Sequence, residues 1–138
     1  MNKIGKGLLP ELKEKINKVE IIPVEIDGQQ FEVEVQTFLS TELRDKLMKY
    51  IQINSTEENV EKFGAEMLGF YSIFQTITNI EFGEELESGM ELFVALSDIG
   101  VVTEIVEKIP EKLFNDITNA LNMTRDIMLQ MAEQNEII

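Results

Sequence analysis

The apolar stretch of residues 57–80, EENVEKFGAEMLGFYSIFQTITNI, constrains the fold more than any other part of the chain. Its apolar residues recur at steps of three and four, which predicts one face of a single long α-helix. That face consists of Val60, Phe63, Met67, Phe70, Phe74 and Ile77. Leu68 and Tyr71 widen it, so we expect a central helix that its neighbours contact from several sides. Ser55, three residues before Glu58, predicts the cap of the first turn.

A chain of 138 residues corresponds to one domain, residues 1–138, that is long enough to bury a core. The sequence contains no cysteine and no histidine, which removes disulfides, thiolate nucleophiles, imidazole bases and nearly all zinc, copper and haem ligation. A serine–lysine or carboxylate-pair enzyme stays formally open, although imidazole is the commonest general base. We therefore expect a protein that is not an enzyme and that needs no cofactor or metal.

The hydropathy pattern argues against a membrane protein. No apolar run approaches the roughly 20 residues needed to span a bilayer. The segment GLLP at residues 7–10 is too short for the apolar centre of a signal peptide. We therefore expect a cytoplasmic location and no membrane association.

The net charge of −14 is unevenly distributed along the chain. Residues 1–18 carry five lysines and two glutamates, a net charge of +3, which leaves −17 on the remainder. So acidic a body cannot hold nucleic acid by neutralising phosphates, and we expect no direct nucleic-acid binding. It suits solubility, the binding of a basic protein surface, or imitation of nucleic acid. The basic segment is either a solvated helix or an arm that docks on another copy, which would make a homo-oligomer.

The first third of the chain predicts a hairpin behind a basic helix. We expect residues 1–9 to be flexible and residues 10–18 to form a short basic helix that opens at Pro10. Residues 20–36 alternate with the period of two that strands show, with strands at about 20–26 and 30–36. Asp27-Gly28 is a strong turn signal between them.

The register of this hairpin stays open at the level of the sequence. A two-residue loop pairs Val24 with Phe31, and a four-residue loop pairs Ile26 with Phe31. In both cases we expect Val24 and Phe31 to be buried. We expect the glutamates of the opposite face to be exposed to solvent: Glu25, Glu32 and Glu34.

Residues 40–134 form the predicted helical region. Ser40 or Thr41 caps a helix that runs to about residue 53, and the central helix follows it. Residues 81–89 read as a turn broken by two glycines, and short helices follow at 90–97 and 101–109. Gly100 and Pro110 separate those helices from each other and from the last long helix. We therefore predict an α+β fold that is mostly α-helical, with one N-terminal β-hairpin packed on a helical bundle.

Two groups of residues are candidates for contact with other molecules. The last helix and the chain end are rich in methionine and isoleucine, and methionine suits adaptable binding surfaces as well as ordinary cores. The candidate protein-interaction residues are Met123, Ile127, Met131, Ile137 and Ile138. The candidate acidic contact consists of Glu84, Glu85 and Glu87. These three glutamates lack the spacing of a calcium loop, and a solvated acidic loop is the alternative.

Three segments carry a family resemblance: IDGQQFEVEVQTFLSTELRDKL, TNIEF and DIGVVTEIVEKIPEKLFNDI. Their order, over roughly residues 20–128, resembles small proteins from the structural gene modules of tailed phages that infect Gram-positive bacteria. Some of those proteins are tail assembly chaperones. The resemblance implies an acidic, mostly helical protein of the host cytoplasm that coats the tape measure protein and brings tail tube subunits to it. The basic N-terminal segment has no counterpart in the resemblance.

Three functional hypotheses follow. The first is a non-enzymatic phage protein that binds other proteins in virion (tail) assembly, chaperone-like for the tape measure or tail tube protein. The second is an acidic inhibitor that occupies a nucleic-acid or ligand site on a host defence protein. The third is a structural component that stays in the virion.

Overall fold

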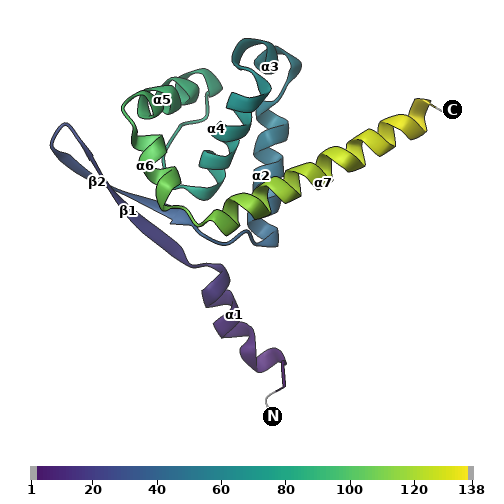
Figure 1. Ribbon diagram of the computed structural model, residues 1–138, viewed down its shortest axis with the longest axis horizontal. Helices are drawn as coiled ribbons and strands as arrows, with labels where there is room; N and C mark the ends of the chain where they lie inside the picture. Colours follow the sequence, from purple (N-terminus) through teal and green to yellow (C-terminus); the bar gives the residue numbers. More distant parts are fainter. Residues whose placement is uncertain (1–2, 137–138) are drawn as a thin grey trace.

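The structure is a computed structural model that describes residues 3–136, without the side chains of residues 124, 127, 128, 131, 132 and 134–136. It confirms an α+β fold that is mostly helical, with one antiparallel hairpin (Figure 1). The strands are β1 (Val19–Ile26) and β2 (Gln29–Gln36). The helices are η1 (Lys6–Leu8), α1 (Leu9–Ile16), α2 (Thr41–Asn54), α3 (Glu57–Phe63), α4 (Ala65–Ile77), α5 (Leu86–Asp98), α6 (Val101–Lys108) and α7 (Glu111–Glu136).

The N-terminal helix ends earlier than expected and is preceded by an extra turn. The predicted helix at residues 10–18 is α1, with Pro10 in its first turn and Ile16 as its last residue. The short 3₁₀ helix η1 lies within the segment 1–9. The expected flexibility of that segment stays a prediction.

The hairpin has the register of the two-residue loop. Val24 pairs with Phe31 and Ile22 with Val33, and Asp27 and Gly28 both take positive φ in the turn. The buried face consists of Ile22, Val24, Val33 and Val35. The three glutamates of the other face are exposed, as predicted.

The loop after α4 ties the hairpin to the helices. Thr78 forms a bridge with Val35 of β2. Beside it, the Asn79 amide donates to the Glu34 carbonyl at 3.1 Å, and the Glu34 amide donates to Asn79 Oδ1 at 2.9 Å. This pairing satisfies part of one edge of the hairpin, which alone would be marginally stable.

Phe31 is not buried, and this part of the prediction is wrong. Its side chain is 42% exposed, whereas Val24, its cross-strand partner, is 2% exposed. Phe31 lies near the turn, and the hairpin tip extends beyond the helices (Figure 1). The alternation therefore identified the correct face, but at this level of the hairpin Val24 reaches the core and Phe31 does not.

The stretch 57–80 is two helices and not one, which corrects the prediction of a single central helix. Gly64 has φ +86° and ends α3, and α4 begins at the next residue. Thr56, and not Ser55, caps α3, because its Oγ1 accepts from the Asn59 amide at 3.2 Å. Before residue 72 of α4 only Leu68 and Tyr71 are buried, so Met67 and Phe70 of the predicted inner face are exposed.

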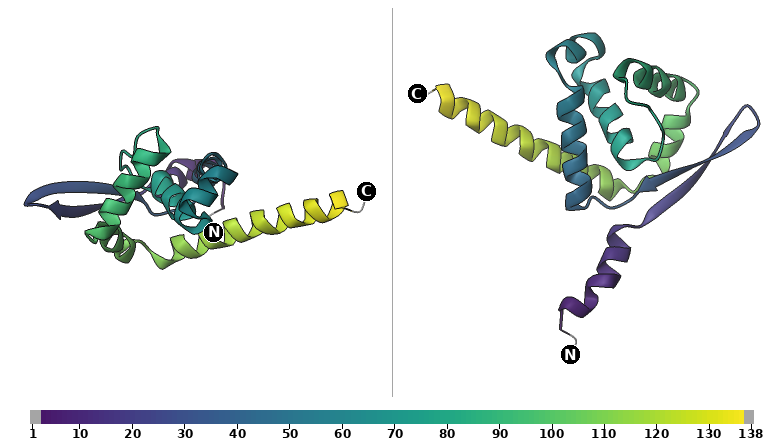
Figure 2. Two further views of the ribbon diagram at one scale, coloured as in Figure 1. Left: turned by 90° about the horizontal axis from the view of Figure 1, so that it is seen from above. Right: turned by 180° about the vertical axis from the view of Figure 1, so that it is seen from behind.

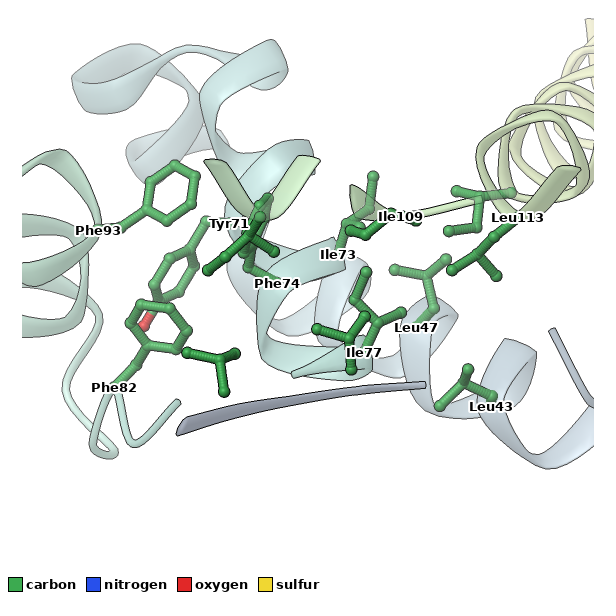
Figure 3. Packing of buried hydrophobic residues seen from close by; sticks show 14 of the residues in the cluster. Leu43, Leu47, Tyr71, Ile73, Phe74, Ile77, Phe82, Phe93, Ile109 and Leu113 are labelled. Atoms are coloured by element: carbon green, nitrogen blue, oxygen red, sulfur yellow. The ribbon is translucent and has the colours of Figure 1, made fainter. Parts of the chain in front are cut away.

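α4 remains the centre of the core, and two groups of side chains pack against it (Figure 3). On one side, four rings pack edge to face: Tyr71 contacts Phe82 and Phe93, and Phe93 also contacts Phe74 and Phe82, with ring centroids 5.1 to 6.2 Å apart. On the other side lie Leu43 and Leu47 of α2, Ile73 and Ile77 of α4, Ile109 after α6, and Leu113 of α7.

A buried polar group joins α2 to α4. Asn54 Nδ2 donates to Ser72 Oγ at 2.9 Å and to Gln75 Oε1 at 2.7 Å. Ser72 Oγ in turn donates to the Leu68 carbonyl at 2.8 Å. Buried polar groups are costly unless paired, so these bonds fix the register of the two helices.

The turn predicted at residues 81–89 is shorter than expected. α5 begins at Leu86, so Gly89 lies inside a helix and is not a breaker. Gly83 and Gly100 do take positive φ, in the loop before α5 and at the start of α6. The other helix boundaries agree with the prediction, including Ser40 Oγ, which accepts from the Leu43 amide at 3.0 Å and caps α2.

Candidate protein-interaction surfaces

The first half of α7 belongs to the core, and the rest leaves the body of the molecule. Leu113, Ile117 and Ala120 are buried. Beyond them the helix extends away from the other elements, as all three views show (Figures 1 and 2). Met123 is 65% exposed and Leu129 is 53% exposed. The two residues are six positions apart, at about 100° per residue, so they lie on different sides of the helix.

Only one of the five candidate interaction residues has a described side chain. Met123 is exposed, as a contact residue should be. Ile127 and Met131 lie within α7, but their side chains are outside the described part. Ile137 and Ile138 lie outside the described residues altogether.

An apolar groove of about 300 Å³ lies between α4 and α7, and we call it the α4/α7 groove. Its lining consists of Glu66, Gly69, Phe70, Ile73, Phe114, Ile117, Thr118 and Leu121. Phe70 is 49% exposed at this groove, although an aromatic ring gains most when it is fully buried. Sequence reasoning missed this site because it placed Phe70 inside the core.

A second apolar groove, of about 350 Å³, lies between the hairpin and the helices α5 and α6. Phe31 and Ile26 line its hairpin side, and Leu92, Leu96 and Val101 line its helical side. The half-exposed Phe31 therefore covers part of a groove instead of filling the core.

A third groove, of about 380 Å³, lies between α3 and α5, and we call it the α3/α5 groove. Phe63, Met90, Val94 and Ala95 form its apolar lining. Glu87, Glu91 and Asp98 supply carboxylates along the same groove.

The three predicted acidic residues are all exposed, but they do not act as one unit. Glu84 is in the loop, Glu85 immediately precedes α5, and Glu87 is in its first turn. Glu87 accepts a hydrogen bond from Lys62 Nζ at 3.1 Å, so its charge is already partly compensated. Within the described residues, no three carboxylates lie close enough to hold a metal ion.

Tyr71 is an ionisable side chain within the core. Burial, with a smaller contribution from Tyr50, raises the pKa of Tyr71 above its ordinary value. The neutral phenol is therefore favoured in the folded state.

No helix within residues 3–136 is both long and apolar enough to cross a membrane.

The chain matches no protein-family model, no curated protein and no solved structure. The arguments on function below therefore start from the residues and the grooves that they form.

Proposed function

We propose that this protein is a non-enzymatic binding protein of tailed-phage assembly, which holds an apolar segment of the tape measure or tail tube protein. The binding surface is the α4/α7 groove together with the part of α7 that continues beyond the body. The observation that carries this proposal is the continuity of the two. The groove holds the half-exposed Phe70, and α7, which forms its other wall, then exposes Leu129 on the same side of the helix as the groove residue Thr118.

Such a surface fits an amphipathic helical segment better than a small polar ligand. Helix-in-groove recognition uses apolar anchors spaced along one helix face, and an exposed aromatic beside a groove supplies the matching contact. The high negative charge of the body then affects mainly the encounter rate and the rejection of wrong partners.

The inhibitor hypothesis places binding at the glutamates before and within α5 instead. Lys62 already pairs with Glu87, which leaves fewer free carboxylates there to imitate a row of phosphates. The apolar surface is therefore the stronger support for the assembly hypothesis.

Co-expression with candidate tape measure and tail tube proteins from the same genome tests the proposal. The readout is the fraction of partner that stays soluble and co-purifies. We expect the double variant Phe70→Ser, Leu129→Ser to lower that fraction at least several-fold, because both side chains are exposed and lie on the groove side. Helical content by circular dichroism should stay near that of the wild type.

A matched control is available on the same chain. Ile53 and Ile99 are 60% and 61% exposed and line none of the three grooves described above, so Ile53→Ser, Ile99→Ser should bind like the wild type. A third variant replaces Glu84, Glu85 and Glu87 with Gln. The inhibitor hypothesis replaces this one if the glutamine variant loses binding while the apolar variant keeps it, and if binding by the wild type falls steeply with salt.

A further inference from the structure

The N-terminal helix stands apart from the body of the molecule. None of the residues of α1 is buried, and Leu9 and Leu12 are 50% and 45% exposed. All three views show η1 and α1 as an arm that leaves the hairpin and points away from the helices (Figures 1 and 2). An isolated helix shorter than about 12–15 residues is marginal in water, and α1 has eight. The arm therefore needs a surface to cover it.

The chemistry of the arm defines that surface. Leu9, Leu12 and Ile16 follow the spacing of one helix face. Lys13 lies beside this face, and residues 1–18 carry a net charge of +3. The surface complementary to the arm is therefore an apolar groove bordered by carboxylates.

The α3/α5 groove has these properties. Its floor is apolar, and Glu87, Glu91 and Asp98 follow one another at steps of four and seven along one side of α5. Lys62 pairs with Glu87. Neither Glu91 nor Asp98 forms an ion pair with any residue that the structure describes. Two carboxylates are thus free for lysines from elsewhere.

The arm cannot reach this groove within its own chain. Only Asn17 and Lys18 separate α1 from β1. The Lys18 carbonyl accepts from Thr37 Oγ1 at 3.3 Å, which holds that end of the arm at the sheet. The arm lies at one end of the molecule and α3 and α5 lie at the other (Figures 1 and 2). The groove that the arm occupies must belong to another molecule.

We propose that the arm of one copy seats in the α3/α5 groove of a second copy of this chain. Leu9, Leu12 and Ile16 cover Phe63, Met90 and Val94, and the arm lysines meet Glu91 and Asp98. Because arm and groove lie at opposite ends, the contact is head-to-tail, and each added copy presents a new arm or groove until a ring closes. This surface is separate from the α4/α7 groove, so self-association does not depend on the proposed function.

Disulfide trapping tests the contact directly, because the chain contains no cysteine of its own. Full-length Leu12→Cys is mixed with full-length Val94→Cys that carries a tag of different size, and the products are read on a non-reducing gel. A disulfide forms only when the two Cα atoms approach to within about 7 Å. We expect the mixed dimer to form at least tenfold faster than with Ile53→Cys, an exposed residue of α2, as the second component. Equal rates overturn the proposal.

A charge exchange supplies an independent readout by sedimentation velocity. Lys13→Glu, Lys15→Glu in one variant, and Glu91→Lys, Asp98→Lys in another, should each raise the dissociation constant of self-association at least tenfold. A mixture of the two variants pairs an acidic arm with a basic groove. Its dissociation constant should return at least half of the way to the wild-type value on a logarithmic scale. Glu25→Lys, Glu32→Lys on the exposed face of the hairpin changes the charge equally but leaves the arm and the groove intact, so this control should self-associate like the wild type. A monomeric wild type at every concentration, or a mixture without recovery, overturns the proposal. The Phe70→Ser, Leu129→Ser variant should associate like the wild type.

Discussion

Gly89 of α5 lies directly against the side chain of Tyr71 of α4, and a β-carbon at position 89 would collide with the tyrosine hydroxyl oxygen. The same β-carbon would lie 3.1 Å from the Phe82 carbonyl oxygen. Tyr71 cannot move aside easily, because Phe82 and Phe93 hold its ring at centroid distances of 5.1 and 5.9 Å. The missing side chain of Gly89 therefore allows α5 to approach α4 closely enough to complete the aromatic cluster.

Gly89→Ala should destabilise the protein even though alanine is the better helix former. The gain in helix propensity is about 1 kcal/mol. Overpacking a well-filled core costs about 1–3 kcal/mol, and here the backbone carbonyl of Phe82 also resists. We expect a net loss of about 1–2 kcal/mol in the free energy of unfolding, measured by urea denaturation.

Gly69→Ala is the matched control for this change. Gly69 is also inside a helix, but no atom outside that helix's own backbone lies within 4 Å of its would-be β-carbon. We expect a gain of about 0.5–1 kcal/mol from helix propensity alone. A gain of equal size at Gly89 would show that α5 does not press on Tyr71.

The raised pKa of Tyr71 predicts a loss of stability at alkaline pH. An unfolded tyrosine titrates near pH 10, whereas burial raises the pKa of Tyr71 above that value in the folded state. The stabilisation from the neutral phenol is thus complete below about pH 10 and is lost as the pH rises through the folded pKa.

Tyr71→Phe removes this titration while keeping the ring. Between about pH 9 and 11, the free energy of unfolding of the wild type should fall more steeply than that of the variant, because only the wild type loses the Tyr71 proton on unfolding. All other side chains are the same in the two proteins, so the comparison isolates the contribution of Tyr71. Parallel pH profiles would contradict the prediction.

The sequence predicts most of the helix boundaries and the hairpin because those depend on local signals. Ser40 as a helix cap, Gly100 as a helix end and Asp27-Gly28 as a turn each act within a few residues, and the structure confirms them. The errors concern glycines whose role depends on their surroundings. Gly64 breaks a helix although apolar periodicity runs through it, and Gly89 continues a helix although it stands in a polar stretch.

The candidate surfaces were harder to predict than the fold for a related reason. The period of an apolar pattern identifies a face but not how far along an element that face is covered. Phe31 and Phe70 both lie on apolar patterns, yet one is near a hairpin turn and the other is in the first half of α4, where neighbours cover the helix on one side only, and both are half-exposed. The grooves at these two residues depend on packing between distant segments, which no local pattern encodes.

The hairpin should therefore divide energetically into a base and a tip. Ile22→Ala, at a fully buried position, should cost about 2–5 kcal/mol in the free energy of unfolding. Phe31→Ala removes a larger side chain but should cost only about 1 kcal/mol, because its ring is 42% exposed in the folded state. Chemical denaturation of both variants measures the difference. An equal cost would mean that the tip of the hairpin is held as firmly as its base.

The break between α3 and α4 predicts a requirement for glycine that differs in kind from the one at Gly89. Gly64 has φ +86° and ψ 145°, a region that is nearly closed to residues with a β-carbon, although no side chain or distant backbone crowds the position. Gly100 has φ +87° and ψ 2°, close to the left-handed conformation that asparagine tolerates. Gly100→Asn should therefore cost less than about 1 kcal/mol, whereas Gly64→Asn should cost about 1–3 kcal/mol as backbone strain. Urea denaturation of the two variants tests this prediction. If asparagine is tolerated equally well at both positions, the strain at Gly64 is relieved, for example by a continuous helix through residues 57–77.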